Sequence, residues 1–314
     1  MKALVYRGAR EVALEERPDP LPLPGELRVR VSAAGLCGSD LHVMATGVSS
    51  VPPPLVLGHE FGGTLDDGRF VVVNPMLACG QCALCARGLT HICPQRRVLG
   101  FRQPGGFAQW VVVPRRNAVP APGLTPLQAA LVEPVANGVH AWQRAGRPLE
   151  NVAVIGAGSV GMSLLHVLVQ RGVQGIDVVD PVPARCEHAL AAGARRVGPR
   201  LEGAYDAVFD AAGTEQTRRD ALAATRPGGS VALIGLHDDT LALSAASLIV
   251  GDRTLAGCFA YTEAEFAEAI ELVRSIDAPW AEAVPFAEAD RAVRDVLAGR
   301  APAGRIKTVF RFDA

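Results

Sequence analysis

Hydrophobic and polar residues alternate in short runs along the first part of the chain, which is the pattern of half-buried β-strands. Residues 26–31 alternate position by position, and residues 70–73 are apolar and largely β-branched. The first seven residues alternate in the same way, and prolines and glycines separate the runs, as at residues 18–25. The pattern predicts a β-rich domain over residues 1–125.

From about residue 125 onward, apolar strands alternate with alanine-rich helical segments. Strands are predicted at residues 152–155, 176–179, 206–209 and 231–234, and helices at 162–171 and 184–192. Apolar strands in this alternation are typical of a parallel sheet that helices cover on both faces. The sequence therefore predicts a doubly wound α/β domain over residues 126–261. Residues 262–314 add two helices and a last strand, and we expect them to return to the first domain.

Composition narrows the classes of function. The chain has 314 residues, 49% hydrophobic and 20% charged, with a formal net charge of -1. This balance is typical of a globular protein and gives no electrostatic reason to expect nucleic acid or an anionic membrane as partner. No apolar run reaches the roughly 20 residues that span a bilayer, and the N-terminus lacks the apolar core of a signal peptide. We therefore expect a cytoplasmic protein. Only two lysines occur, Lys2 and Lys307.

A glycine-rich turn follows the first strand of the α/β domain. Gly156, Gly158 and Gly161 form a G-x-G-x-x-G pattern between a predicted strand and a predicted helix. Such glycines allow a tight turn, close approach of a pyrophosphate, and close packing of the helix on the sheet. The free N–H groups of the helix N-terminus then face the phosphates. We predict that this turn, with Ser159 and Val160, binds a dinucleotide.

The end of the second strand bears on which dinucleotide is bound. Asp180 is placed to accept hydrogen bonds from the ribose hydroxyls of NAD and to repel the additional phosphate of NADP. Two alternatives remain: Asp180 can be a turn former before Pro181, and Arg185 can stack on adenine or bind a 2′-phosphate. We predict NAD rather than NADP, with further contacts from Ile234 and Leu236 at the end of the strand predicted at residues 231–234 and just beyond it.

Four cysteines lie close together, at Cys79, Cys82, Cys85 and Cys93. Thiolates at this spacing can close a tetrahedron around zinc and leave no open position, so the predicted role is structural. An iron–sulfur cluster is the other metal candidate, ranked below zinc. A nucleic-acid-binding zinc ribbon is disfavoured because no dense basic run surrounds these cysteines.

A second set of potential ligands is spread over three segments. Cys37 and His59 are natural ligands of a catalytic zinc, which takes three protein ligands and keeps one position open. Either Glu60 or Glu133 can supply the third ligand, and Asp40 can orient the His59 ring.

The ordered set of motifs resembles the zinc-containing medium-chain dehydrogenase/reductase family. The matching stretches are GLCGSDLH at 35–42, GHEF at 58–61, CGQCALCARGLTHIC at 79–93, GGFAQWVVVP at 105–114, VEPVANGVHA at 132–141 and VIGAGSVG at 154–161. The resemblance implies a GroES-like catalytic domain and a Rossmann coenzyme domain. It makes Ser39 and His42 the residues that carry away the substrate proton, and Glu60 and Glu133 alternative zinc ligands. The segment between Glu60 and Arg69, and the C-terminal portion, are short for the family.

The implied activity is zinc-dependent hydride transfer from a secondary or polyol alcohol to NAD, which gives a ketone or aldehyde. The alternatives are a sugar-phosphate, amino-cyclitol or threonine-type dehydrogenase of the family, a zinc-free reductase, and a non-enzymatic NAD-binding relative. The resemblance also implies a homodimer or homotetramer, paired through residues 247–259.

Overall fold

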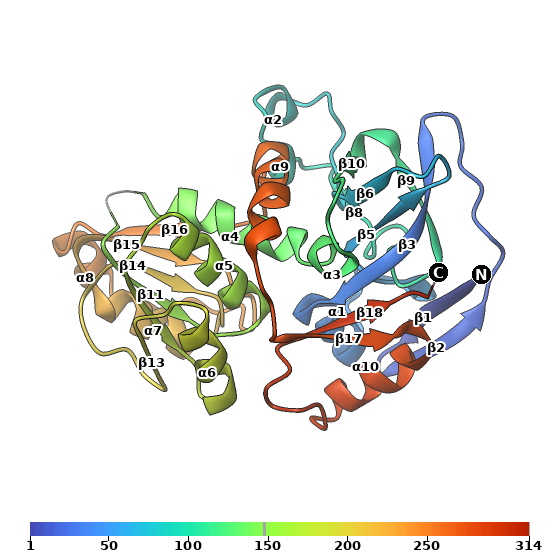
Figure 1. The fold of residues 1–314 in the computed structure, drawn as a ribbon. Coiled ribbons are helices and arrows are strands. Elements are labelled where there is room, and N and C mark those ends of the chain that lie inside the picture. Colours follow the sequence, from blue (N-terminus) through green and yellow to red (C-terminus); the bar gives the residue numbers. More distant parts are fainter. Residues whose placement is uncertain (147–148, 314) are drawn as a thin grey trace. The chain divides into compact units, whose positions relative to one another are not determined.

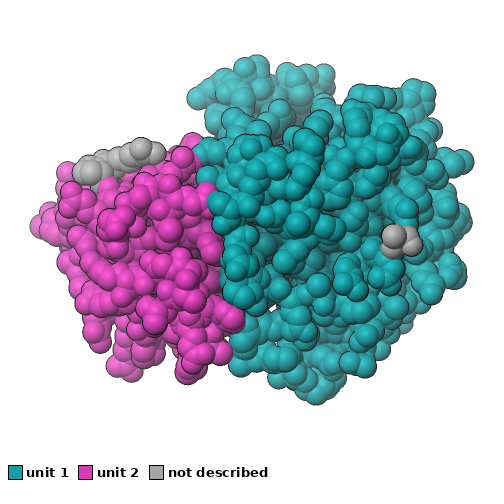
Figure 2. All heavy atoms as spheres, viewed as in Figure 1, with its two compact units in different colours: residues 1–133, 262–314 teal, residues 134–261 magenta. Residues whose placement is uncertain are grey.

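The structure, a computed structural model, describes residues 1–146 and 149–313, and these form two compact units (Figures 1 and 2). Unit 1 comprises Met1–Glu133 and Thr262–Ala314, and unit 2 comprises Pro134–Tyr261. The chain therefore leaves unit 1 once and returns to it. The predicted boundary at 125/126 differs from this division because α3 (Pro126–Ala129) packs on two strands of unit 1.

Unit 1 is built on a seven-stranded sheet whose long central strand is β3 (Glu26–Leu36). The main path of this sheet is β10-β6-β5-β3-β18-β17, and β9 also pairs with β3. The other strands of the unit are β1 (Lys2–Gly8), β2 (Glu11–Glu16), β4 (Leu55–Val56), β5 (Glu60–Leu65), β6 (Phe70–Val73), β7 (Met76–Leu77), β8 (Arg97–Val98), β9 (Trp110–Pro114), β10 (Ala118–Pro120), β17 (Ala281–Pro285) and β18 (Lys307–Arg311). Strand β18 is antiparallel to β3, so the C-terminal segment completes the sheet that the N-terminal segment begins (Figure 1).

The core of unit 1 is apolar and partly aromatic. Phe107 and Phe310 meet edge to face with ring centroids 5.2 Å apart, and both are fully buried. The helices of the unit are α1 (Gly38–Thr46), α2 (Ala83–Ala86), α9 (Glu263–Leu272) and α10 (Ala289–Leu297), in addition to α3. Helix α10 packs against β2, β17 and α1 (Figure 1).

Unit 2 contains a six-stranded sheet in which every pair of neighbours is parallel. Its strands are β11 (Asn151–Ile155), β12 (Gly175–Val179), β13 (Arg196–Gly198), β14 (Tyr205–Asp210), β15 (Thr225–Leu233) and β16 (Thr254–Gly257). Its helices are α5 (Ser159–Gln170), α6 (Pro183–Ala191), α7 (Glu215–Ala224) and α8 (Ala245–Val250), and α4 (Val132–Arg144) contains the unit boundary. The strand order β13-β12-β11-β14-β15-β16 is the Rossmann order 3-2-1-4-5-6. The predicted Rossmann fold is confirmed.

Helix α1 is the main difference from the β-rich pattern predicted for the first domain. It begins after Cys37, where Asp40 accepts a hydrogen bond from the Cys37 N–H as in a capping box, and it ends at Gly47. Nine residues are too few to show a clear helical period, so the pattern did not reveal this helix. Among the residues that the structure describes, no helix is long and apolar enough to cross a bilayer.

Candidate functional site

The fold brings three of the predicted metal ligands together at one end of the unit 1 sheet. Cys37 follows the last residue of β3, and His59 and Glu60 stand at the start of β5, where Glu60 pairs with Gly35 of β3. Possible ligand atoms of Cys37, His59 and Glu60 all lie within 4.8 Å of one another. A thiolate, an imidazole and a carboxylate form a donor set that suits zinc, and three protein ligands leave one position open.

Asp40 fixes the orientation of this cluster from within α1. Its side chain is fully buried, and its two oxygens accept hydrogen bonds from the Cys37 N–H at 3.0 Å and the Gly58 N–H at 3.3 Å. One of these oxygens also lies 3.4 Å from Nδ1 of His59. A carboxylate at Nδ1 leaves Nε2 as the donor to a metal.

The pKa of His59 reflects the same surroundings. Burial acts to lower this pKa, but the Asp40 carboxylate and Cys37 more than offset the burial and raise it well above its ordinary value. The groups around the imidazole therefore stabilise positive charge at this point, as expected of a site that takes a cation.

Sequence reasoning did not identify Lys307 as part of this site. Lys307, the first residue of β18, forms an ion pair with Glu60, and both side chains are almost completely buried. Burial acts to lower the pKa of Lys307, but the Glu60 carboxylate reverses the effect, so the pKa lies above its ordinary value. A Cβ on Gly35 would lie 2.8 Å from Cε of Lys307, which shows how tightly the pair is enclosed.

Three further residues were predicted for this site: Glu133, Ser39 and His42. Glu133 is buried in the first turn of α4, and it contributes to raising the pKa of Lys307. Within the described part of the chain, Glu133 does not belong to the cluster of Cys37, His59 and Glu60. Ser39 and His42 are exposed and lie three positions apart on α1, a spacing that places them on one side of the helix.

The four clustered cysteines have the geometry of a tetrahedral metal site. Their Sγ atoms are 3.5 Å apart in the pairs Cys82–Cys85 and Cys79–Cys93, and 3.9 Å apart in Cys79–Cys85 and Cys82–Cys93. Zinc–sulfur bonds of about 2.3 Å in a tetrahedron require sulfur separations of about 3.8 Å. Backbone N–H groups of Gln81 and Cys82 lower the pKa of Cys79 to about 6, which favours the thiolate that zinc needs.

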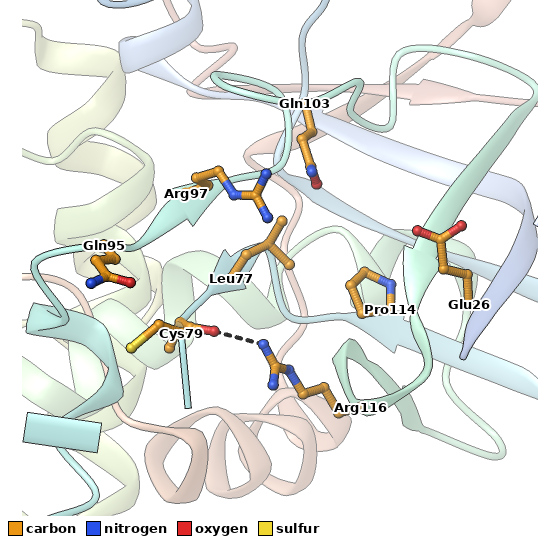
Figure 3. Close-up of a pocket in the computed structure, with 9 residues that line it drawn as sticks. Glu26, Leu77, Cys79, Gln95, Arg97, Gln103, Pro114 and Arg116 are labelled. Carbon is orange, nitrogen blue, oxygen red and sulfur yellow. Dashed lines mark hydrogen bonds between the residues drawn. The ribbon is translucent and has the colours of Figure 1, made fainter. Parts of the chain in front are cut away.

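A polar pocket of about 330 Å³ adjoins this cysteine segment (Figure 3), and Cys37, His59 and Glu60 are not among its lining residues. Cys79 lines it together with Arg97 and Arg116, and Arg116 donates a hydrogen bond of 2.6 Å to the carbonyl of Ala78 (Figure 3). Zinc with four thiolates carries a net charge of about −2. The hydrogen bond from Arg116 ties the segment to the chain that follows β9, and the positive charge of the two arginines near the pocket would partly offset that of such a site.

The glycine-rich turn of unit 2 fits a pyrophosphate. Gly158 is the N-cap of α5, and a Cβ placed on it meets no described atom within 4 Å, so the backbone is open to a ligand. The hydroxyl of Ser159, at the start of the helix, is buried and lacks a hydrogen-bond partner among the described residues. A Cβ on Gly161 would lie 1.8 Å from the carbonyl oxygen of Gly156, so only glycine allows this packing. The free N–H groups and the unpaired hydroxyl suit a phosphate. Val160 lies in the same first turn.

Asp180 is buried just after β12, beside the same turn. It accepts hydrogen bonds of 2.9 Å from the N–H groups of Ala157 and Val182, and Nη1 of Arg185 lies 3.5 Å from it. Ile234 is half-buried directly after β15, whereas Leu236 is 80% exposed. These positions all follow the carboxyl ends of parallel strands, where nucleotides bind in sheets of this kind.

Comparison with known proteins gives family matches in both parts of the chain. Residues 23–123 match the alcohol dehydrogenase GroES-like domain, and residues 159–275 match the zinc-binding dehydrogenase family. L-galactonate-5-dehydrogenase of Escherichia coli K12 is 31% identical over 96% of this chain and 96% of its own length.

Two solved structures are similar over nearly the whole chain. The NADH complex of an E. coli CFT073 alcohol dehydrogenase, rspB, has a TM-score of 0.91 and 26% identity over 99% of both chains. Galactitol-1-phosphate dehydrogenase from E. coli has a TM-score of 0.90 and 27% identity, over 99% of this chain and 100% of its own. With a GroES-like domain, a Rossmann domain and a sequence match along its length, this chain belongs to the zinc-binding alcohol dehydrogenase family of oxidoreductases.

Proposed function

We propose that this chain is a zinc-dependent dehydrogenase that transfers a hydride from a secondary or polyol alcohol to NAD and releases a ketone or aldehyde. The observation that carries the proposal is the convergence of Cys37, His59 and Glu60 on one buried point, in a chain that also has a dinucleotide turn. Neither feature alone would indicate alcohol oxidation, but together they provide a metal site and a hydride acceptor site.

Each residue has a separate task in this proposal. Cys37, His59 and a carboxylate from Glu60 or Glu133 hold the catalytic zinc, and Asp40 keeps His59 in orientation. Zinc bound there supplies a Lewis acid that lowers the pKa of the alcohol hydroxyl. Ser39 and His42, exposed on α1, take the proton and pass it to solvent. The four-cysteine segment holds a second, structural zinc.

The chain's preference for NAD is proposed to depend on Asp180. We expect Asp180→Ser to lower kcat/KM for NAD by roughly 30-fold, because a hydrogen bond to a charged group contributes about 2 kcal/mol. The activity with NADP should rise, because the charge that repels a 2′-phosphate is gone and Arg185 loses its acidic neighbour. Steady-state kinetics with both cofactors measure the change. An unchanged ratio of the two kcat/KM values would show that Asp180 only shapes the turn.

The substrate is proposed to be a polyol or a related secondary alcohol. The similar proteins named L-galactonate-5-dehydrogenase and galactitol-1-phosphate dehydrogenase support this class. The test is a screen of NAD reduction over secondary alcohols, diols, polyols, sugar phosphates and threonine, with zinc measured in the same samples. We expect two zinc ions per chain and turnover with at least one of these classes. Turnover that survives complete removal of metal would overturn the mechanism.

We further propose that the chain forms a homodimer or homotetramer through residues 247–259. Helix α8 ends on two strongly exposed apolar residues, Ile249 at 75% and Val250 at 86%, and β16 is an edge strand of the sheet. Exposed apolar surface beside a free strand edge favours pairing with a second copy. Light scattering over a dilution series gives the mass, and a monomer at micromolar concentration would contradict the proposal.

A cytoplasmic location is proposed because the clustered thiols must stay reduced to bind zinc.

A further inference from the structure

One aromatic side chain lies against the metal-binding histidine. The rings of Phe101 and His59 have centroids 5.0 Å apart and planes inclined by 34°. Phe101 is half-buried and lies in the loop that follows β8. The metal, proton-transfer and nucleotide functions assigned above make no use of this residue.

The loop that carries Phe101 is held by its own backbone. The N–H groups of Phe101 and Arg102 both donate to the carbonyl of Val98, at 3.1 and 3.0 Å, and the Gly100 N–H donates to Gln103 at 2.7 Å. These bonds close a compact turn around Phe101. Its position is therefore set by the turn and does not depend on contact with the histidine.

The same loop is bound to the segment that carries His59. The N–H groups of Gly105, Gly106 and Phe107 donate to the carbonyls of Val56, Gly58 and Leu57, at 2.9, 2.8 and 3.0 Å. These six residues pair the two segments as a short backbone ladder just before His59.

Two glycines allow the backbones to approach more closely than side chains permit. A Cβ on Gly105 would lie 2.1 Å from the carbonyl oxygen of Gly58, and one on Gly100 would lie 2.8 Å from it. Gly100 also has φ of 84°, which disfavours any other residue. The contact between the loop and the histidine segment is thus built into the backbone.

We propose that Phe101 is a positioning residue for the metal ligand His59. An oxygen of Asp40 lies 3.4 Å from Nδ1 of the imidazole and Phe101 lies against the ring, so the remaining nitrogen is directed to the point shared by Cys37 and Glu60. A carboxylate at one nitrogen acts on the tautomer and the ring orientation through a single atom of the ring. An aromatic ring packed against the imidazole adds a second contact that limits its tilt. The inference deepens the proposed function, since it depends on a metal at Cys37 and His59.

The test compares the two metal sites within one protein. Phe101→Ala in the zinc-loaded chain should weaken metal binding at the Cys37 site by about 10-fold or more, the range seen when groups that orient metal ligands are removed. The four-cysteine site should keep its affinity. Competition with a chromophoric chelator resolves the two sites, and the visible spectrum after cobalt substitution of the Cys37 site reports its coordination geometry. Phe101→Leu, which keeps apolar volume against the ring, should recover much of the loss.

Phe312→Ala is the matched control. Phe312 is also half-buried in unit 1 and stacks on Phe286 at 4.1 Å, and removing its ring should leave both metal sites unchanged. The inference is overturned if Phe101→Ala binds metal at the Cys37 site within twofold of wild type with the same cobalt spectrum. It is also overturned if both metal sites weaken equally, or if Phe312→Ala has the same effect. A wild-type chain that binds no metal at Cys37 would instead refute the proposed function.

Discussion

Replacing Cys37 by alanine is expected to abolish alcohol oxidation and to reduce the bound zinc from two ions per chain to one. Cys37 supplies the thiolate of the three-residue cluster, and His59 and Glu60 alone form a weak site for zinc. Without the Lewis acid, the alcohol keeps its ordinary pKa, and the transition state loses several kcal/mol of charge stabilisation. We expect kcat to fall by at least about 10³-fold, which corresponds to about 4 kcal/mol. Metal analysis and initial rates of NAD reduction measure both effects.

The control for this variant is a second cysteine outside both metal clusters. Cys258→Ala removes a half-buried thiol of unit 2 and should keep two zinc ions per chain. Its zinc content is the control, because Cys258 lies in the segment proposed for subunit pairing. NAD binding, measured by fluorescence titration, should be unchanged in both variants. If the Cys37 variant retained two zinc ions and its turnover, the catalytic metal would have to be bound elsewhere.

The fold could be predicted from the sequence where periodicity and turn chemistry agree. The parallel strands of unit 2 are apolar along their length, and the glycine pattern marks where the first of them ends, so β11, β12 and the end of α5 are predicted closely. Helix α5 begins at Ser159, before the predicted start at residue 162. In unit 1, residues 32–36 extend β3 beyond the predicted run. Small residues in that stretch give little alternation, and the strand is held there by its partners β5 and β18.

The metal site could be predicted only in part. A sequence shows which residues have side chains that can bind a metal, but it does not show which residues the fold brings together. Cys37 and His59 were predicted because thiol and imidazole groups are common zinc ligands, and because the motifs that contain them occur in the same order along the chain as in the zinc-containing dehydrogenases that the sequence resembles. Phe101 and Lys307 were missed because neither lies in a motif that indicates metal binding. Each comes close to the metal ligands only in the folded structure. One signal for Lys307 was available: it is one of two lysines in a chain whose positive charge is otherwise arginine. A compact ammonium group, unlike a planar guanidinium, fits beside the closely packed Gly35.

Replacing Lys307 by methionine is expected to destabilise the protein by about 3–5 kcal/mol, the usual effect of removing one member of a buried ion pair. The side chain of Lys307 is fully buried, and so is the Glu60 carboxylate that it neutralises. Methionine fills a similar volume, so the effect measures the uncompensated charge of Glu60 and not a cavity. Urea unfolding at equal zinc content gives the change in the free energy of unfolding. Lys2→Met, at the exposed second residue, is the matched control and should change stability by less than about 0.5 kcal/mol.

The double variant Lys307→Met with Glu60→Gln separates the charge effect from other effects of the substitution. Because the neutral amide leaves no buried charge without a partner, the double variant should be more stable than Lys307→Met alone. The coupling between the two positions should be about 2–3 kcal/mol. If the two substitutions instead change the free energy of unfolding additively, the Glu60 carboxylate must have another partner in the folded protein. The proposed catalytic zinc would be that partner. Measuring the same four proteins (wild type, the two single variants and the double variant) at reduced zinc content tests that explanation directly. The coupling energy between positions 60 and 307 must then reappear, because without the metal the Glu60 carboxylate pairs with Lys307.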